Sequence, residues 1–354
     1  MKIFTFFIEP ATYSLDLKKN IYHDLGIDSV FIKKNRSIAK SSEEDDYEAL
    51  EGNSLFFKLR FIVNVFKSYD FIIINGYTSF VFIFLFLLNK ISKNKVCLAI
   101  ESDTPLSQPK NKFKKKLKTI FLNYIFKPCW VLGFAGGNAS HKELFRHYGM
   151  AEKKIYFMPM MVDNSKYYPI KTDNTSHKFT FLFVGRVVPN KNIEELLIAF
   201  SKWNKNNKGC LLKVIGDGEL LAKFKENYKS DSIAFTGAKN SNDLYVEYQD
   251  ADVFILPSLH EPWGLVVNEA MCSGLPVIVS NKVGAAYDLV EGKDTGFIFE
   301  VGNVEALIKK LDIMYHNKVL RNKFSFNALE LMKSNWNYEL YKKCLLKALQ
   351  YKAN

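Results

Sequence analysis

The stretch ADVFILPSLHEPWGLVVNEAMCSGLPVIV, residues 251–279, decides the fold of this 354-residue chain. It reads as an apolar strand, a loop, a helix, a Gly-Leu-Pro turn and a second apolar strand. Strand, helix and strand in this order predict a βαβ unit, in which the two strands lie parallel in one sheet. Ligands of such folds bind at the carboxyl ends of the strands. We therefore expect a binding site in the loop after the first strand.

Two glutamates, Glu261 and Glu269, lie eight positions apart in that loop and helix. Eight residues span about 2.2 turns of an α-helix, so both carboxylates can lie near one face. Taken alone, the pair is most simply two solvated acids on a surface helix. The turn Pro262-Trp263-Gly264 between them, together with the motifs upstream, favours a role in binding.

The alternation of strands and helical stretches runs through the whole chain and predicts an α/β fold with mainly parallel sheets. A chain of this length exceeds one ordinary core, so we expect two domains. We place the first at residues 1–165, the second at 166–335, and a C-terminal helix at 336–354 that packs back on the first. The expected strands are Lys2–Ile8, Ser29–Ile32, Phe71–Asn75, Lys95–Ile100, Trp130–Ala135, Phe179–Val184, Cys210–Ile215, Ile233–Thr236, Val253–Leu256, Pro276–Val279 and Gly296–Phe299.

Composition narrows the class of protein. Five scattered cysteines without a Cys-x-x-Cys pair argue against a disulfide framework or a zinc site and fit a reducing cytosol. The apolar start Met1–Ile8 is too short for a signal peptide, so we expect a first strand and a cytoplasmic protein. The apolar block Phe71–Leu88 is broken at residues 75–79, whereas a membrane span needs ~20 unbroken apolar residues.

The net charge of +12 indicates an anionic partner, such as nucleic acid, anionic lipid or a phosphorylated substrate. Six lysines within Lys110–Lys118 lead into an apolar stripe at helical spacing, formed by Phe113, Leu117, Ile120, Phe121, Tyr124 and Ile125. Such a basic amphipathic helix can lie on an anionic bilayer, or it can be a domain helix whose stripe packs on the sheet. No nucleic-acid module surrounds these lysines, so we expect membrane contact and no nucleic acid.

A candidate phosphate site follows the strand Phe179–Val184. Gly185 ends the strand, Arg186 and Lys191 lie five residues apart, and a helix then begins. The N-terminus of a helix carries positive partial charge and free N–H groups. The planar fork of arginine and the point charge of lysine together suit a diphosphate, although the motif alone also fits two solvated bases.

Two further glycine turns follow strand ends, at Gly216 in Ile215–Glu219 and at Gly237 in Phe235–Lys239. Glycine lets the backbone approach a flat ligand, such as a base or a ribose. Plain turns between strand and helix are equally compatible with these residues.

Together these motifs resemble the retaining glycosyltransferases of family 4, which have the two-lobed GT-B fold. The resemblance covers about residues 170–300. The matching pieces are Gly185-Arg186…Lys191-Asn192, Ile215-Gly216-Asp217-Gly218, Leu256-Pro257-Ser258, Glu261-Pro262-Trp263-Gly264…Asn268-Glu269-Ala270, Ser273-Gly274-Leu275-Pro276-Val277-Ile278 and Asp294-Thr295-Gly296-Phe297. The resemblance implies two Rossmann-like lobes facing a central cleft. It also implies a UDP- or GDP-linked sugar as donor, held mainly by the second lobe, and no metal or other cofactor.

The resemblance assigns a role to each matching residue. Arg186 and Lys191 would neutralise the donor diphosphate, and Glu261 would hold sugar hydroxyls; we take these three as catalytic. Glu269 would hydrogen-bond the ribose. The other expected donor contacts are Gly185, Gly216, Gly237, Lys239, Pro262, Trp263, Gly264 and Leu265, with Gly264 and Leu265 acting through backbone N–H groups. Two cations and a helix N-terminus can meet the charge on a departing nucleoside diphosphate without a metal.

Two parts of the sequence fit this resemblance less well. Asp250-Ala251-Asp252 is formally an Asp-x-Asp, which could hold a divalent cation, but it comes just before a buried strand and we expect no metal there. The first lobe lacks the glycine pair that many relatives carry after the first strand. Thr12, Glu101 and Asp103 are our candidates for binding the acceptor.

The resemblance thus implies a metal-independent, retaining hexosyltransferase, and the basic helix at Lys110–Lys118 favours a place on the inner face of the plasma membrane. Its expected acceptor is a glycan or an undecaprenyl-diphosphate-linked oligosaccharide in O-antigen or capsule assembly. A nucleotide-sugar 2-epimerase of the same fold is the alternative. A solute-binding protein would need export, and a nicotinamide-dependent dehydrogenase would want Gly-x-Gly-x-x-Gly in the loop at residues 8–14, which has no glycine.

Overall fold

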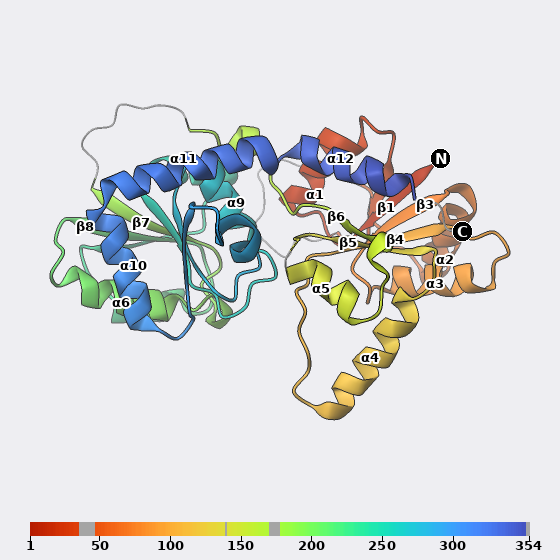
Figure 1. The fold of residues 1–354 in the computed structure, drawn as a ribbon, viewed down its shortest axis with the longest axis horizontal. Helices are drawn as coiled ribbons and strands as arrows, with labels where there is room; N and C mark the ends of the chain where they lie inside the picture. Colours follow the sequence, from red (N-terminus) through yellow and green to blue (C-terminus); the bar gives the residue numbers. More distant parts are fainter. Residues whose placement is uncertain (35–46, 139, 170–177, 352–354) are drawn as a thin grey trace. The chain divides into compact units, whose positions relative to one another are not determined.

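The computed structural model describes residues 1–34, 47–138, 140–169 and 178–351. The chain divides into two compact units, each with its own sheet (Figure 1). Unit 1 comprises Met1–Met160 and Tyr338–Asn354, and unit 2 comprises Met161–Asn337. These limits lie a few residues from the expected ones at 165 and 335. Each unit is described by itself below.

Unit 1 contains a six-stranded parallel sheet with the strand order β2-β1-β3-β4-β5-β6. Its strands are β1 (Ile3–Phe7), β2 (Asp28–Phe31), β3 (Phe71–Asn75), β4 (Cys97–Ser102), β5 (Val131–Ala135) and β6 (Ile155–Phe157). Every residue of β1, β3 and β5 is buried, as expected for a parallel sheet covered on both faces. The sequence predicted the first five strands and missed β6, because three residues at the sheet edge give no periodic signal.

Helices cover the sheet of unit 1. They are α1 (Thr12–Leu17), η1 (Lys18–Tyr22), α2 (Leu55–Ser68), α3 (Phe80–Ile91), α4 (Lys112–Phe126), α5 (Ser140–His147), η2 (Glu152–Lys154) and α12 (Tyr338–Leu349). Helices α2, α3 and α4 begin at N-caps Ser54, Ser79 and Asn111, whose side chains accept backbone N–H groups of the first turn. The C-terminal helix α12 packs against η1 and β6 of this unit. It is shorter than the helix expected at residues 336–354.

Unit 2 contains a second six-stranded parallel sheet with the order β12-β11-β10-β7-β8-β9. Its strands are β7 (Phe179–Val184), β8 (Cys210–Ile215), β9 (Ile233–Gly237), β10 (Val253–Leu256), β11 (Val277–Ser280) and β12 (Gly296–Phe299). All six were predicted from the sequence, to within one residue at each end. The order places β7 and β10 next to each other at the centre, so the loops that follow these two strands are neighbours.

The helices of unit 2 complete the alternation of strand and helix. They are η3 (Asn164–Lys166), η4 (Pro189–Lys191), α6 (Ile193–Asn204), α7 (Leu221–Asn227), α8 (Ser241–Gln249), α9 (Leu265–Cys272), η5 (Ala286–Val290), α10 (Val304–His316) and α11 (Lys318–Asn335). The polar stretch Asp163–Lys178, where the sequence predicts the linker between the two domains, lies partly outside the described residues. Over the part of the chain that the structure describes, no helix combines the length and apolar character needed to cross a bilayer.

Candidate active site

Three glycine turns meet at the carboxyl edge of the sheet in unit 2. The N–H of Gly185 donates to Ile215 O at 3.0 Å, and the N–H of Gly216 donates to Gly237 O at 2.9 Å. A Cβ on Gly216 would lie 1.8 Å from Gly185 O, which no side chain can tolerate. Glycine at 216 is therefore required by backbone packing, in addition to any approach of a ligand. At Gly237 the requirement is different, because φ is +78° and a Cβ would meet open space.

The two cations predicted after β7 have different surroundings. Arg186 is exposed, and its guanidinium forms no hydrogen bond or ion pair with any residue that the structure describes. Lys191 ends the η4 turn, and its side chain lies close to Gly185. A Cβ built on this glycine would be 3.8 Å from Lys191 Cε. Arg186 is thus available to an anion from outside, whereas Lys191 is built into the turn.

Lys191 forms an ion pair with Glu261 across the neighbouring loops that follow β7 and β10. Both side chains are mostly covered, with 14% and 15% of their surfaces exposed. The contact joins two residues that the sequence assigned separately, one to the diphosphate and the other to the sugar. A cation, an acid and the free guanidinium of Arg186 therefore lie on two adjacent loops at one sheet edge.

Two asparagines hold the η4 turn against the loop after β10. Asn190 Nδ2 donates to His260 O at 2.7 Å, and Asn190 O accepts the N–H of Leu259 at 2.9 Å. Asn192 adopts a left-handed conformation with φ of 52°, and its amide binds Glu195 and, at 3.3 Å, Pro257 O. These bonds fix the position of Lys191 relative to Glu261.

The loop that carries Glu261 is also held from its other side. The N–H of Glu261 donates to Lys282 O, Glu261 O accepts the N–H of Gly284, both at 2.9 Å, and Trp263 O accepts from Ala285 at 3.0 Å. Gly264 then turns into α9 with φ of +96°, and a Cβ there would press on Glu261 Cγ at 3.1 Å. The first N–H groups of a helix lack intrahelical partners and carry positive partial charge. The N-terminus of α9, at Leu265, therefore adds donors beside Glu261.

Trp263 lies inside unit 2. Only 1% of its surface is exposed, its Nε1 donates to Asn268 Oδ1 at 2.8 Å, and its ring stacks on Trp336 at 5.4 Å with planes 13° apart. The sequence predicts Trp263 as a donor contact. In the structure its indole is buried inside unit 2 and anchors the loop there. Nothing in the local pattern pointed to Trp336, which lies 73 residues later in the chain.

Glu269 lies in α9, half-buried, with its Oε2 accepting a hydrogen bond of 2.7 Å from the Tyr248 hydroxyl. Burial raises the pKa of Glu269 above its ordinary value, and hydrogen bonds from Tyr248 and Tyr167 partly offset this rise. Tyr248 is fully buried in α8 and was not predicted. It holds one oxygen of the carboxylate in a fixed direction.

Lys239, one of the expected donor contacts, forms an ion pair with Glu247, which also binds Lys213. The hydrogen bond to Glu247 raises the pKa of Lys239. Its ammonium group is therefore already engaged by a carboxylate of α8. Pro262 lies beside Glu261, half-buried.

The Asp-x-Asp motif lies at the other edge of this sheet. Asp252 comes before β10, and its Oδ2 accepts the N–H of Thr180 at 2.8 Å, which ties the start of β7 to β10. Glu261 follows the opposite, carboxyl end of β10. Within the described ranges, no three His, Cys, Asp or Glu side chains are grouped so as to hold a metal ion.

The acceptor candidates of unit 1 gather around Tyr13, which sequence reasoning missed. Thr12 is exposed at the start of α1, and Asp103 follows β4. Burial raises the pKa of the Tyr13 hydroxyl, and the charges of Asp103, Glu101 and Glu9 raise it further. The ends of β1 and β4 thus bring several acids to one place at the carboxyl edge of this sheet.

Glu101 is buried, with 8% of its surface exposed. Its carboxylate accepts hydrogen bonds from Asn75 Nδ2 at 2.6 Å and from the Tyr341 hydroxyl of α12 at 3.2 Å. Burial is the main cause that raises its pKa to about 7; Asp103 adds to the rise, and the two hydrogen bonds oppose it. Both carboxylate oxygens therefore have partners inside unit 1, and one of these partners fastens the C-terminal helix.

We expect the stability of unit 1 to fall between about pH 4.5 and pH 7 because of Glu101. Its folded-state pKa of about 7 lies above the ordinary value of 4.5, so the folded state binds the proton more tightly. The stabilisation is complete below pH 4.5, is lost as the pH rises to about 7, and amounts to roughly 3 kcal/mol. Unfolding curves of the parent and of Glu101→Gln across this range test it. An identical pH dependence in the two proteins would show that Glu101 does not titrate there.

Unit 2 is similar in sequence to known proteins. The sequence profile of the family "Glycosyl transferases group 1" matches residues 168–331. The chain is 33% identical over 183 residues to a UDP-Gal:alpha-D-GlcNAc-diphosphoundecaprenol alpha-1,3-galactosyltransferase of Escherichia coli, covering 47% of this chain and 46% of that protein. It is 32% identical over 164 residues to an uncharacterized glycosyltransferase of Haemophilus influenzae, covering 45% and 46%. The matches thus span about half the length of these relatives.

A solved structure extends the likeness in fold to both units. A glycosyltransferase from Rickettsia africae superposes with a TM-score of 0.76 over 99% of this chain and 100% of that one, at 17% sequence identity. The α/β fold of GT-B type, with two parallel six-stranded sheets and their helices, is therefore confirmed. Residues 168–331, which make up most of unit 2, are thus similar in sequence to the glycosyl transferases group 1 family.

Proposed function

We propose that this protein transfers a hexose-type sugar from a UDP- or GDP-linked donor to a glycan or an undecaprenyl-diphosphate-linked oligosaccharide. The transfer would keep the anomeric configuration and serve the assembly of a bacterial surface polysaccharide, such as O-antigen or capsule. The matched Escherichia coli protein, which is named for a UDP-linked donor and a diphosphoundecaprenol acceptor, supports this class of substrates.

One observation carries the proposal. Arg186, the Lys191–Glu261 pair and the N-terminus of α9 lie on adjacent loops at the carboxyl edge of a sheet whose sequence is that of a glycosyltransferase family. Arg186 has no partner among the described residues, so it is free to bind a diphosphate. A ligand with a diphosphate next to a sugar presents an anion for the cations and hydroxyl groups for Glu261. The arrangement suits both halves of such a ligand at once.

The chemistry that follows is stabilisation of a leaving group. When the bond between the sugar and the diphosphate breaks, negative charge gathers on the departing phosphate. Arg186, Lys191 and the N–H groups at Gly264 and Leu265 are preorganised donors for that charge, the kind of interaction that contributes most in such reactions. Glu261 holds sugar hydroxyls, and Glu269 holds the ribose. Of the acceptor candidates, Thr12 and Asp103 follow strand ends in unit 1 and would orient the attacking hydroxyl.

A donor and acceptor assay with a chelator tests the proposal. Purified protein, a panel of UDP- and GDP-linked hexoses and undecaprenyl-diphosphate-linked sugars should give nucleoside diphosphate and an extended acceptor. Addition of EDTA should leave the rate unchanged, because cationic side chains and the helix N-terminus replace a metal. Loss of transfer in EDTA that is restored by a divalent cation would contradict the metal-independent mechanism.

Two features of the product complete this test. The anomeric proton coupling of the new linkage should show the same configuration as the donor sugar, and an inverted product would contradict retention. Turnover of a donor without any acceptor, with a change at C2 of the sugar, would instead indicate a nucleotide-sugar 2-epimerase.

We further propose that the protein works on the inner face of the plasma membrane, with the lysines of Lys110–Lys118 near anionic lipid. Five of these six lysines are exposed. The sixth, Lys118, donates to Ser107 O at 2.7 Å and serves the fold. Each lysine near an anionic surface contributes about 1 kcal/mol, so this segment alone favours contact with such a membrane.

A further inference from the structure

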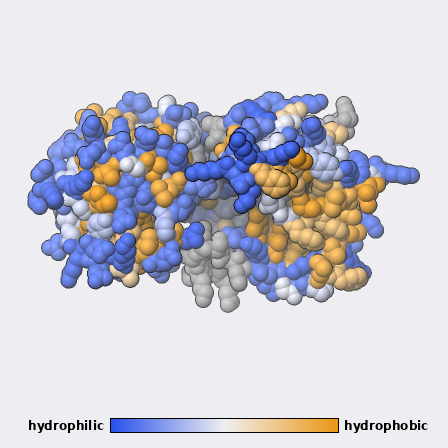
Figure 2. Space-filling model, turned by 90° about the horizontal axis from the view of Figure 1, so that it is seen from below, coloured by the Kyte–Doolittle hydropathy of each residue, from blue (hydrophilic) through white to orange (hydrophobic). Residues whose placement is uncertain are grey.

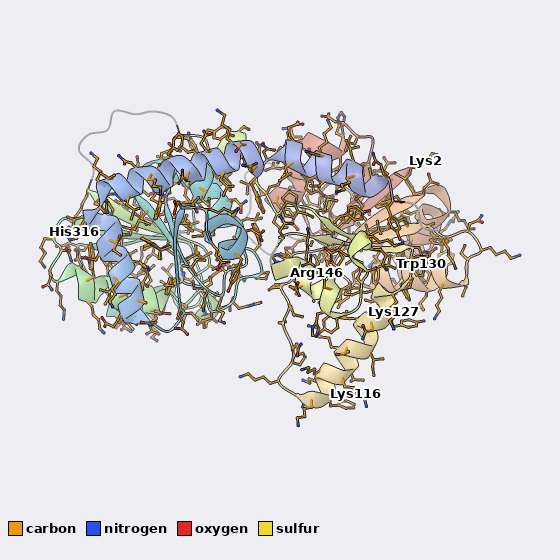
Figure 3. All side chains as sticks on the ribbon, viewed as in Figure 1. Lys2, Lys116, Lys127, Trp130, Arg146 and His316 are labelled. Atoms are coloured by element: carbon orange, nitrogen blue, oxygen red, sulfur yellow. The ribbon has the colours of Figure 1, made fainter. Side chains whose placement is uncertain are left out.

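Helix α4 packs into unit 1 mainly through its C-terminal part. Leu122, Ile125 and Phe126 are buried there, and the ammonium of Lys154 donates to Phe126 O at 2.7 Å and to Pro128 O at 2.9 Å. These bonds satisfy carbonyl groups at the end of the helix. The rest of α4 projects from the unit, with Lys116 near its free end and Lys127 near its attached end (Figures 1 and 3).

The apolar stripe on the projecting part is not packed inside the unit. Phe113, Leu117 and Ile120 expose 69%, 51% and 58% of their surfaces, and Phe121 and Tyr124 are also exposed. Of the two interpretations that the sequence left open, a stripe packed on the sheet therefore holds only for the last turn.

Helices α2 and α3 continue this apolar surface. Phe86 of α3 packs against the Tyr124 ring of α4 at 5.5 Å, and α3 packs on α2. Exposed apolar side chains lie on both, at Leu55, Phe56, Phe57, Phe80, Leu87 and Ile91. We call the exposed apolar residues of α2, α3 and α4 the three-helix face. Figure 2 shows hydrophobic residues gathered on the side of unit 1 from which α4 projects.

The charges of the three helices have one sign. Lysine and arginine number three in α2, one in α3 and five in α4, and the three helices contain no aspartate or glutamate. Single exposed apolar residues are ordinary, but a large apolar surface among basic side chains marks a site of interaction. A second copy of the chain would bring cations against cations, and a nucleic acid would leave the apolar side chains without a partner. An anionic bilayer offers both phosphate groups and hydrocarbon.

We propose that the three-helix face inserts its apolar side chains into the interfacial layer of an anionic phospholipid bilayer, with the lysines of α4 among the headgroups. Amphipathic helices with this composition lie in the plane of the interface, with their apolar side below the headgroups. The inference deepens the proposed function, on which it rests for the lipid-linked acceptor. Insertion of apolar side chains differs from a purely electrostatic contact, because the contact with hydrocarbon still holds the protein at the membrane when salt screens the charges.

Vesicle flotation separates the two contributions. Vesicles of phosphatidylethanolamine and phosphatidylglycerol are mixed with the full chain at low salt and at 0.5 M salt. Ile91→Gln/Phe113→Gln/Leu117→Gln keeps every charge and should lower binding at least about 10-fold at both salt concentrations. Val319→Gln/Phe326→Gln on α11 removes equally exposed apolar side chains from unit 2 and should bind as the parent does. Lys114→Gln/Lys115→Gln/Lys116→Gln should lower binding about 100-fold at low salt.

Fluorescence then reports insertion directly. The four tryptophans of the chain, Trp130, Trp203, Trp263 and Trp336, are all buried, so a tryptophan introduced on the face reports the bilayer. Brominated acyl chains should quench Phe113→Trp and should not quench Phe326→Trp. Unquenched Phe113→Trp, or vesicle binding that survives the apolar substitutions, would overturn the proposal. So would a dimer of the parent chain that these substitutions dissolve, because the face would then be a protein interface.

A nucleotide-sugar assay on the same proteins keeps this proposal distinct from the proposed function. The apolar variant should retain the thermal shift that the donor produces, since its substitutions lie in unit 1. If vesicle insertion is observed and no nucleotide sugar binds, the membrane proposal stands and the glycosyltransferase proposal fails.

Discussion

Replacing Arg186 by alanine should lower kcat/KM for the nucleotide sugar about 10²–10³-fold, the typical cost of one preorganised donor to a developing negative charge. The guanidinium is exposed and free of partners among the described residues, so its removal leaves no buried group unsatisfied. The thermal midpoint of the protein without ligand should therefore stay within about 1 °C of the parent, as for most surface substitutions. Initial rates of nucleoside diphosphate release measure the effect.

Two control variants sharpen this prediction. Arg186→Lys keeps the charge and loses the planar fork, so it should recover part of the lost rate. Lys205→Ala removes an exposed cation at the C-terminal end of α6, the end of this helix away from Lys191, and should leave the rate unchanged. Full activity of Arg186→Ala would refute the role of this side chain at the diphosphate.

Replacing Lys191 by alanine should have a similar effect on the rate, about 10²–10³-fold, together with a loss of stability. The ion pair with Glu261 is mostly covered, so the substitution leaves a half-buried carboxylate without its cation. Leaving such a group unpaired costs about 1–3 kcal/mol. Thermal unfolding and initial rates, measured on the same preparation, separate the two consequences.

The double variant Lys191→Ala/Glu261→Gln distinguishes a role at the diphosphate from a role in the pair alone. A neutral amide in place of the carboxylate removes the unpaired charge, so the double variant should regain thermal stability. It should remain far less active than Glu261→Gln alone, because the cation for the diphosphate is still absent. If the double variant were as active as Glu261→Gln, Lys191 would serve only to neutralise Glu261.

The sequence predicted the sheets well because the strands are parallel and buried on both faces. Apolar runs such as Phe179–Val184 and Val253–Leu256 have sharp ends and carry that signal in their own residues. The sequence did not predict β6, because the pairing of this strand depends on the neighbouring strand β5 rather than on its own pattern. The site residues Arg186, Lys191, Gly264 and Glu269 stay predictions; their motifs lie in the loops that follow β7 and β10 and in α9.

What the sequence could not predict were contacts between distant residues. Lys191 and Glu261 are 70 residues apart, and nothing local shows that they meet. Trp263 was expected to contact the donor, but Trp336 covers its ring inside unit 2. Glu101 gains a partner from Tyr341, 240 residues later, which changes its surroundings from an open loop to a closed interior. The pattern of α4 predicted an amphipathic helix but could not show which part of its stripe stays uncovered.

Thermal unfolding against a panel of UDP- and GDP-linked sugars shows directly whether unit 2 binds a nucleotide sugar through Arg186. A ligand at 100 times its Kd stabilises the folded protein by about 2.7 kcal/mol, which should raise the midpoint by roughly 5 °C or more. We predict such a rise for at least one nucleotide sugar with the parent protein and a much smaller one with Arg186→Ala. No rise with any nucleotide, or an equal rise in both proteins, would contradict the account.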